Sequence, residues 1–309
     1  MQPDNVPKQI KVAIAEALQL LQSTHWQHGR TSQKSPDPLP SLLEQCGELF
    51  HADKTDEPEP IRTIHHFAGS GGTLVSKCLA AMPNSQVLSE VNPYSGLAFH
   101  GGRFFPTDLI RLVKAGSRGA DDSLVASIFL GGLREVYDDC NRKGLYLILR
   151  DHSHGQYCLG SEVPKTPALR TLLRTEYPCL SVVTVRNPVD SYLSLIANGW
   201  RHFTPFSLDE YCRRYECFLD DHNDVTIYRY EELVENSVET MQCICSTLKI
   251  SFVTGFEEIF PVHTLSGDSG RKGNRIEYRE RRSIPEKVKK EIDDSVLLPR
   301  LFDRLGYKY

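Results

Sequence analysis

A run of small and polar residues between 66 and 74 has the composition of an anion-binding loop. It follows an apolar, β-rich segment and reads His66-Phe67-Ala68-Gly69-Ser70-Gly71-Gly72-Thr73-Leu74. The glycines let backbone N–H groups approach an anion without a Cβ in the way, and a helix that begins here would add its own unpaired N–H groups. Ser70 and Thr73 supply hydroxyl donors. The pattern predicts a site for a phosphate or another oxyanion, and the alternative is a flexible turn with a helix cap.

A second pattern with the same chemistry lies about 120 residues further on. Arg186 closes a buried-type strand, and Ser194 follows it on the helix that begins near Pro188. Proline suits the first turn of a helix, and Asp190 suits the positive end of that helix. An arginine and a serine in this arrangement can hold a phosphate together. In the alternative interpretation, Arg186 pairs with an acid and Ser194 is a surface hydroxyl.

Two more polar clusters follow predicted strands. Glu90 ends one strand, and Arg150, Asp151 and His152 end another. Carboxylates and imidazoles are common general acids and bases in enzymes. The structural alternatives are a salt-bridged carboxylate at Glu90 and a hydrogen-bonded turn at Asp151 and His152.

The segments that must position these residues alternate between strand and helix from about residue 60 onwards. We expect strands at Ile61–Phe67, Gln86–Glu90, Leu145–Arg150, Leu180–Val185 and Val225–Tyr230. We expect helices at Thr73–Met82, Thr107–Ala115, Asp121–Arg142, Leu169–Glu176, Pro188–Asn198, Ser207–Asp220, Ser237–Leu248 and Pro285–Leu305. This order predicts a three-layer α/β/α fold with a mainly parallel central sheet. Ligands of such sheets bind at the carboxyl ends of the strands, where every polar cluster above falls.

The first 60 residues of the chain differ from the rest in composition. Residues 7–22 carry apolar side chains at helical spacing, and residues 29–60 are rich in Ser, Pro, Asp and His. We therefore expect an N-terminal helical extension and linker over residues 1–58 and one domain over residues 59–309.

Taken together, these motifs resemble those of the PAPS-dependent sulfotransferases. The loop 66–74 resembles their 5′-phosphosulfate loop, and Arg186-Asn187-Pro188-Val189-Asp190 with Ser194 matches their 3′-phosphate motif. The segment Tyr230-Glu231-Glu232-Leu233-Val234 resembles a stretch that follows a later strand in that family, and Arg271-Lys272-Gly273 resembles its late basic element. The match follows the family order, covers about the last 250 residues, and is closest to soluble bacterial-type members. It implies a P-loop NTPase-like sulfotransferase fold.

The resemblance also implies a reaction. The donor would be 3′-phosphoadenosine 5′-phosphosulfate (PAPS), and the acceptor a hydroxyl or amine of a small molecule or glycan. By the same resemblance, Glu90 is the first candidate for the general base and His152 the second, with orientation of the sulfonate as its other role. The family's cytosolic-type members carry a basic residue where this chain has Gly69. Arg150 is the first candidate to replace that charge, ahead of Lys77, His65 and His66.

Composition narrows the remaining possibilities. The 36 basic and 40 acidic residues give a net charge of −4, so uniform basicity cannot drive binding to nucleic acid. The sequence has no apolar run long enough to span a membrane and no signal-peptide core, and its scattered cysteines suit a reducing compartment; these features favour a cytoplasmic protein.

No metal-binding spacing stands out. A P-loop nucleotide kinase is disfavoured because the loop lacks its lysine and no magnesium-binding acid is clear. A non-catalytic nucleotide-binding module is the other alternative.

Overall fold

The computed structural model describes residues 19, 57–95, 107–267, 275–278 and 280–308. The chain divides into two compact units, Met1–Glu57 and Pro58–Tyr309, and the elements below belong to the second. The helix expected over residues 7–22, apart from residue 19, lies outside the described residues, as do Arg271, Lys272 and Gly273.

Five parallel strands form the central sheet, in the spatial order β2-β3-β1-β4-β5. They are β1 (Ile61–His66), β2 (Ser85–Val91), β3 (Tyr146–Asp151), β4 (Cys179–Val185) and β5 (Thr226–Arg229). All five coincide with the strands predicted from the sequence, to within a few residues at each end. The α/β prediction with a parallel sheet is therefore confirmed.

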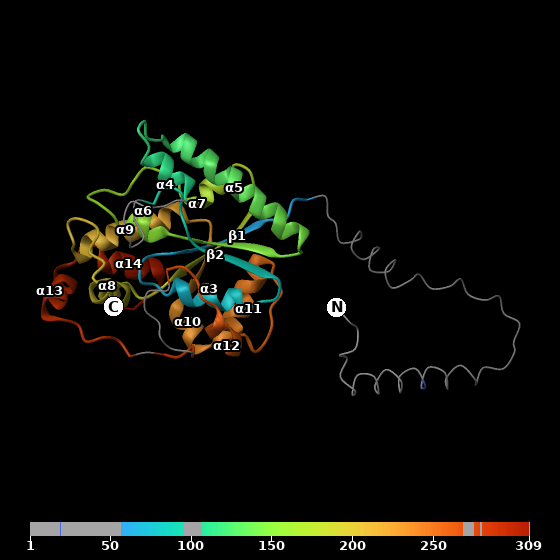
Figure 1. Ribbon diagram of the computed structural model, residues 1–309. Coiled ribbons are helices and arrows are strands. Elements are labelled where there is room, and N and C mark those ends of the chain that lie inside the picture. The colour runs from blue at the N-terminus through green and yellow to red at the C-terminus, as the bar shows by residue number, and fades with distance from the viewer. Residues whose placement is uncertain (1–18, 20–56, 96–106, 268–274, 279, 309) are drawn as a thin grey trace, which may run out of the picture. The chain divides into compact units, whose positions relative to one another are not determined.

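Helices cover both faces of this sheet (Figure 1). They are α3 (Gly72–Ala80), α4 (Leu109–Lys114), α5 (Asp122–Arg142), α6 (Ser153–Tyr157), α7 (Leu169–Leu173), α8 (Pro188–Ala197), α9 (Leu208–Asp221), α10 (Tyr230–Glu235), α11 (Ser237–Leu248), α12 (Phe256–Ile259), the 3₁₀-helix η1 (Phe260–Val262), α13 (Glu286–Asp294) and α14 (Leu298–Leu305). In Figure 1, α5 and α7 lie above the sheet, and α3 and α11 lie below it. None of the described helices is both long enough and apolar enough to span a bilayer.

The two faces of the sheet have separate apolar cores because successive side chains of a strand point to opposite sides. Ile64, Ile148 and Val182 pack with α3 and α11 on one face. Leu147 and Leu149 pack with α5 and α7 on the other. A third cluster includes Val183 and Val185 of β4 and joins them to α8, α9 and α14. Every residue of the central strand β1 is buried, as expected for a strand covered on both faces.

The strand order reverses between β1 and β4, which is the topological switch point of the sheet. The connection after β1 leads towards β2, whereas the connection after β4 leads towards β5, although β1 and β4 are neighbours. Their pairing runs in register from Ile61↔Cys179 to His66↔Thr184, so both strands end at the same level. A crevice at such a reversal is where open α/β sheets bind ligands. The loop after β1 and Arg186 after β4 both lie at this position.

The prediction of a single C-terminal helix over Pro285–Leu305 is wrong, because this segment forms the two helices α13 and α14. The chain is extended at Ser295, which ends α13, and the Ser295 hydroxyl then accepts a hydrogen bond from Leu298 N at 3.0 Å. This contact caps the start of α14, whose first turn contains Pro299. The short helices α6, α10, α12 and η1 carry too few residues for a periodic pattern, and the sequence does not predict them.

Ile64 offers a test of this packing. Its side chain is fully buried between the sheet and the helices α3 and α11. Ile64→Ala therefore removes apolar contacts and leaves a cavity. We expect a loss of about 2–5 kcal/mol in the free energy of unfolding, measured by chemical denaturation. Leu109→Ala, at a position 58% exposed on α4, is the control and should change stability by less than about 0.5 kcal/mol. Equal effects of the two variants would contradict the described core.

Candidate active site

The loop between β1 and α3 is shaped by two glycines in the left-handed region. Gly69 has φ 83° and Gly71 has φ 86°, which side chains with a Cβ rarely adopt. Gly71 is the N-cap residue of α3 and has no side chain to satisfy the first N–H groups of the helix. These donors are therefore available to a ligand at the positive end of α3.

Several side chains of the loop are used to hold its shape. The Ser70 hydroxyl donates to the carbonyl oxygens of Phe67 at 2.7 Å and Thr184 at 3.3 Å, which fixes the loop to the end of β4. The Thr73 hydroxyl donates to the Gly267 carbonyl at 3.4 Å. The Leu74 side chain is buried in the core beneath α3. Of the backbone N–H groups, those of Ser70 and Leu74 donate to the carbonyl oxygens of Phe67 at 3.2 Å and Gly71 at 3.0 Å. The loop's clearest donors to a ligand are thus the backbone N–H groups between these two residues.

A side chain could not be placed at Gly69 without displacing the loop's neighbours. A Cβ there would lie 2.8 Å from the Ser191 carbonyl oxygen and 2.9 Å from a methyl group of Leu195, both on α8. Backbone conformation and packing together therefore exclude a basic side chain at this position. Any positive charge at the loop has to come from another element.

Tyr230 joins the loop to the second predicted anion site. A Cβ on Gly71 would lie 2.4 Å from Cδ2 of Tyr230, so the tyrosine ring packs directly against the glycine. The guanidinium of Arg186 lies over the same ring, 4.8 Å from its centroid. The two sites, 115 residues apart in sequence, thus meet on one aromatic ring.

Arg186 has no carboxylate partner among the described residues, and its Nε is buried without a hydrogen bond. The next residue, Asn187, caps α8 by accepting from Val189 N at 3.0 Å and Asp190 N at 3.4 Å. Asp190 itself pairs with Arg281 at 2.8 Å. The arginine is therefore placed beside a helix start with its charge uncompensated, which favours an anion there.

Ser194 lies one turn before the end of α8 and is partly buried; its hydroxyl accepts from Asn198 at 3.5 Å. This long contact leaves the hydroxyl able to meet another group. Glu231 fixes the neighbouring backbone, since it accepts from Asn187 N at 3.0 Å and from the Tyr307 hydroxyl at 2.7 Å. Neither Asn187 nor Glu231 was singled out from the sequence for these supporting roles, although both fall inside the recognised motifs.

Glu90, Arg150 and His152 form one buried cluster at the ends of β2 and β3. Glu90 Oε1 lies 2.9 Å from Arg150 Nη1, and Glu90 Oε2 lies 3.4 Å from His152 Nε2. The side chains of Glu90 and Arg150 are only 10% and 5% exposed. The strand order β2-β3-β1 brings this cluster next to the loop.

The backbone of Glu90 is strained in a way that aims its side chain. Its φ is 63°, and the pairing of β2 with β3 shifts register between Leu88 and Val91. A non-glycine residue in this region costs on the order of 1–3 kcal/mol, and such strain clusters at functional sites. Gly267 packs against the carboxylate so closely that a Cβ there would overlap it.

Arg150 connects Glu90 to the loop through His66. Its Nη1 donates to Ser89 Oγ at 3.0 Å, and its Nη2 lies 3.1 Å from His66 Nε2. An arginine can only donate, so His66 accepts at Nε2 and carries its proton on Nδ1. Burial, and then the charge of Arg150, hold the pKa of His66 well below its usual value, so the ring is neutral. Its Nδ1–H is buried and meets no acceptor in the described part of the chain, and its ring packs on Gly72.

Both ring nitrogens of His152 are engaged. Nδ1 lies 3.1 Å from the Ser95 hydroxyl, and Nε2 faces Glu90. Burial lowers the pKa of His152, although the Glu90 carboxylate opposes this shift. His152 is therefore a neutral, positioned imidazole near neutral pH.

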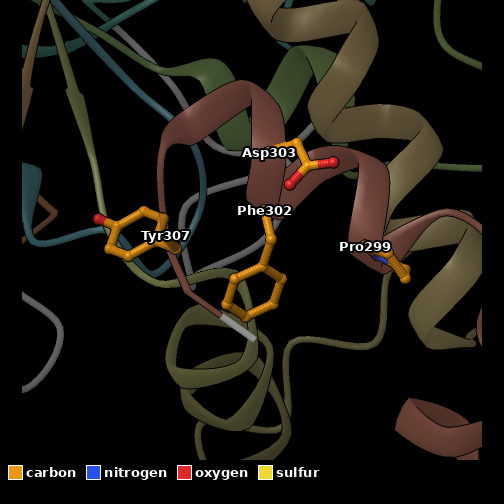
Figure 2. A pocket seen from close by; sticks show the side chains of 4 residues that line it. All are labelled: Pro299, Phe302, Asp303 and Tyr307. Carbon is orange, nitrogen blue, oxygen red and sulfur yellow. The ribbon is translucent and has the colours of Figure 1, made fainter.

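A surface hollow of about 290 Å³ lies over the last helix, and none of the predicted site residues lines it. Its walls are Pro299, Phe302 and Asp303 of α14 together with Tyr307 (Figure 2). Tyr307 donates to Glu231 and thereby supports the backbone next to Arg186. The hollow thus borders the supporting residues of the site but not the predicted chemistry.

The contact between Gly71 and Tyr230 gives a testable prediction. Gly71→Ala forces a Cβ into the left-handed region, at about 1–2 kcal/mol, and into the tyrosine ring, at about 1–3 kcal/mol more. Gly119→Ala is a matched control, because Gly119 has φ 67° but open space around it. We expect Gly71→Ala to destabilise more than Gly119→Ala in chemical denaturation, and Tyr230→Ala to relieve the difference. Equal losses at the two glycines would show that the ring is not in tight contact.

Comparison with known proteins shows what this arrangement is similar to. Neither a protein-family model nor a curated protein matches the sequence. Among solved structures, the chain is similar to a sulfotransferase domain from the Synechococcus PCC 7002 olefin synthase, with 17% identity, a TM-score of 0.51, and coverage of 83% of this chain and 98% of that one. A sulfotransferase domain from the curacin biosynthetic pathway has 15% identity and a TM-score of 0.49, with coverage of 82% and 99%.

A mouse sulfotransferase, SULT7A1, whose structure holds PAP, has 14% identity and a TM-score of 0.41, with coverage of 85% and 94%. The similarity to the olefin synthase domain, together with the parallel five-stranded sheet, establishes the architecture. The described part of this chain has the P-loop-like sulfotransferase fold.

Proposed function

We propose that this protein is a sulfotransferase that uses PAPS as donor. The observation that carries the proposal is the placement of two anion sites on one tyrosine. The Tyr230 ring packs against Gly71 of the loop, and the guanidinium of Arg186, which has no carboxylate partner among the described residues, lies over the same ring. A nucleotide with phosphates at both its 5′ and 3′ positions has the charge distribution that two such sites require.

Each site receives one end of this donor. The 5′-phosphosulfate is held by the backbone of residues 69–74 at the start of α3, where the helix dipole favours negative charge. The 3′-phosphate is held by Arg186 and Ser194, with Arg271, Lys272 and the Gly273 backbone adding charge. The acceptor is a hydroxyl or amine of a small molecule or glycan, and the protein works in the cytoplasm without a membrane span or a nucleic-acid partner.

The reaction is an in-line displacement at sulfur. The acceptor oxygen or nitrogen forms a bond to sulfur while the bond from sulfur to the bridging phosphate oxygen breaks. The acceptor's proton passes to a base, and adenosine 3′,5′-bisphosphate leaves with the negative charge of the bridging oxygen. Positioning and fixed dipoles supply most of the acceleration in group transfers of this kind.

Glu90 is our first candidate for the base and His152 the second. Glu90 ends β2 beside the loop, and its strained backbone aims a buried carboxylate into the cluster. Both nitrogens of His152 already have partners, one of which is Glu90 itself. We therefore assign His152 to orienting Glu90 and the sulfonate.

Arg150 replaces the charge that Gly69 cannot carry. Arg150 donates to His66 Nε2 and so polarises the imidazole, whose Nδ1–H has no partner among the described residues and lies against Gly72 of the loop. A donor backed by a guanidinium stabilises developing charge on a phosphate oxygen more strongly than a neutral donor does. The kinase alternative has no such support, because the P-loop lysine would follow the last glycine of the loop and this position, after Gly72, is Thr73.

Ligand specificity tests the donor assignment. Adenosine 3′,5′-bisphosphate should raise the melting temperature of the protein, whereas ATP with magnesium should not. Arg186→Ala should weaken binding of the bisphosphate by about 10- to 100-fold, since it removes a charged hydrogen bond. Ser194→Ala should weaken it by about fivefold. Isothermal titration calorimetry measures both.

Arg134→Ala is the control for this experiment. Arg134 is an exposed arginine on α5 that pairs with Glu176, and its loss should leave nucleotide affinity unchanged. Stabilisation by ATP with magnesium but not by the bisphosphate would favour a kinase. Tight bisphosphate binding without sulfate transfer to any acceptor would favour a nucleotide-binding module.

Turnover separates the two candidate bases. Glu90→Gln keeps an oxygen that can accept from Arg150 but cannot take up a proton. We expect it to spare binding of the bisphosphate and to lower turnover by about 10²–10⁴-fold. Release of the bisphosphate from PAPS is measured against a panel of phenols, alcohols, amines and sugars. Normal turnover of Glu90→Gln together with inactivity of His152→Ala would reverse the assignment.

A further inference from the structure

A second polar cluster lies on the opposite side of the sheet from the loop, fully enclosed by protein. It contains His65 of β1, Asp151 of β3 and His222 at the end of α9. All three side chains are buried, with exposures of 0%, 0% and 1%. One potential ligand atom of each lies within 4.8 Å of the other two. Neither the proposed reaction nor the motifs in the sequence account for this cluster.

The outer nitrogens of both histidines are already fixed. His222 Nδ1 lies 2.7 Å from the Phe218 carbonyl oxygen, which can only accept, so the proton is on Nδ1 and Nε2 presents a lone pair. His65 Nε2 lies 2.9 Å from the Thr63 hydroxyl, which in turn meets Ser181 at 2.7 Å. A histidine that binds a metal through one nitrogen characteristically donates its other N–H to such an acceptor.

Two inner atoms of the cluster, His222 Nε2 and Asp151 Oδ1, are buried without a hydrogen bond to any described residue, whereas Asp151 Oδ2 faces His65 Nδ1 at 3.0 Å. The Ser153 hydroxyl is close enough to Asp151 to favour its ionised form. With an ionised carboxylate, no histidine tautomer supplies a donor to His222 Nε2 while His222 Nδ1 donates to Phe218.

We propose that His65, Asp151 and His222 form a binding site for a divalent transition metal ion, with zinc as the best fit. Two imidazole nitrogens and a carboxylate that can bind through both oxygens provide four donor atoms, which matches the preferred coordination number of zinc. Metal–ligand bonds of about 2.0–2.2 Å place ligand atoms about 3.3 Å apart. The pair at 3.0 Å already meets this spacing, and the widest separation has to close by about 1.5 Å at most.

The charge around the cluster is compatible with a cation. Asp151 contributes one negative charge, and Asp221 lies close enough to favour positive charge at His222. Arg170 opposes positive charge at His65, but its guanidinium is paired with Asp224 through two hydrogen bonds of 2.7 Å. The ion would tie the ends of β1 and β3 to the end of α9, and would thereby hold the strand end that carries Arg150 and His152.

The competing arrangement has no metal. Burial raises the pKa of Asp151 to about 6, and a protonated Asp151 could donate from Oδ1 to His222 Nε2. The two arrangements differ in their response to added metal, because only the metal-binding arrangement gains stability from it.

The experiment uses the full chain, stripped with a chelator and dialysed. Added zinc should raise the melting temperature of the wild type, and about one ion per chain should remain bound after gel filtration, as counted by elemental analysis. Cobalt should give the visible absorption of a four-coordinate site without a thiolate charge-transfer band. His222→Gln should abolish the zinc-dependent shift.

His202→Gln is the matched control, because His202 is an exposed histidine paired with His154 at 3.0 Å and lies outside the cluster. It should keep both the bound ion and the shift. Thr63→Val preserves volume but removes the acceptor for His65, and should weaken zinc binding by about 10- to 100-fold. This variant keeps the test decisive if His222→Gln fails to fold.

The proposal would be overturned if zinc did not raise the melting temperature of the wild type. It would also be overturned if the zinc-dependent rise persisted in His222→Gln or was unchanged in Thr63→Val, or if cobalt gave a thiolate band. The first of these results would favour the protonated carboxyl, and the last a cysteine site. Because the readout is metal binding, the result is independent of whether the protein transfers sulfate.

Discussion

The candidate site depends on the in-register pairing of two neighbouring parallel strands. Because β1 and β4 pair in register to His66↔Thr184, the loop and Arg186 leave the sheet at the same level and side by side. Both then contact the ring of Tyr230, which packs against Gly71 and lies under the Arg186 guanidinium. A shift of one residue in this pairing would turn the side chains of β4 to the opposite face and separate the two anion sites.

The position of Gly69 excludes a basic side chain in the loop itself. Gly69 is confined by its positive φ and by α8, so a basic group near the loop has to come from another element, and Arg150 of β3 is the candidate. Arg150 is buried against Glu90 and contacts the His66 ring, which packs on Gly72 of the loop. This relay links the candidate base and the loop in one network, so a change at either end alters the electrostatics of the other.

Much of this fold could be predicted from the sequence because the strands are short, apolar and bounded by turn residues. The residues at the strand ends were also identifiable, since glycine, arginine, glutamate and histidine at such positions are chemically distinctive. What could not be predicted is which strand ends meet. The contact of Glu90 with Arg150 depends on the order β2-β3-β1, and the left-handed backbone of Glu90 depends on a register shift between β2 and β3. The break at Ser295 depends on a distant partner, Asp209 of α9, which binds the Ser295 hydroxyl.

Two adjacent pairs of residues explain why the sheet has a distinct polar cluster on each face. Side chains alternate along a strand, so His66 and Arg150 point towards the loop, whereas His65 and Asp151 point to the opposite face and meet His222. The same two strand ends therefore carry both clusters, and whatever fixes Asp151 also fixes the backbone of Arg150 and His152. A rigid link at Asp151 restricts the motion of the groups proposed to handle charge and protons, without itself contacting a substrate. In this arrangement, the enclosed face of the sheet sets the precision with which the opposite face can place its reacting groups.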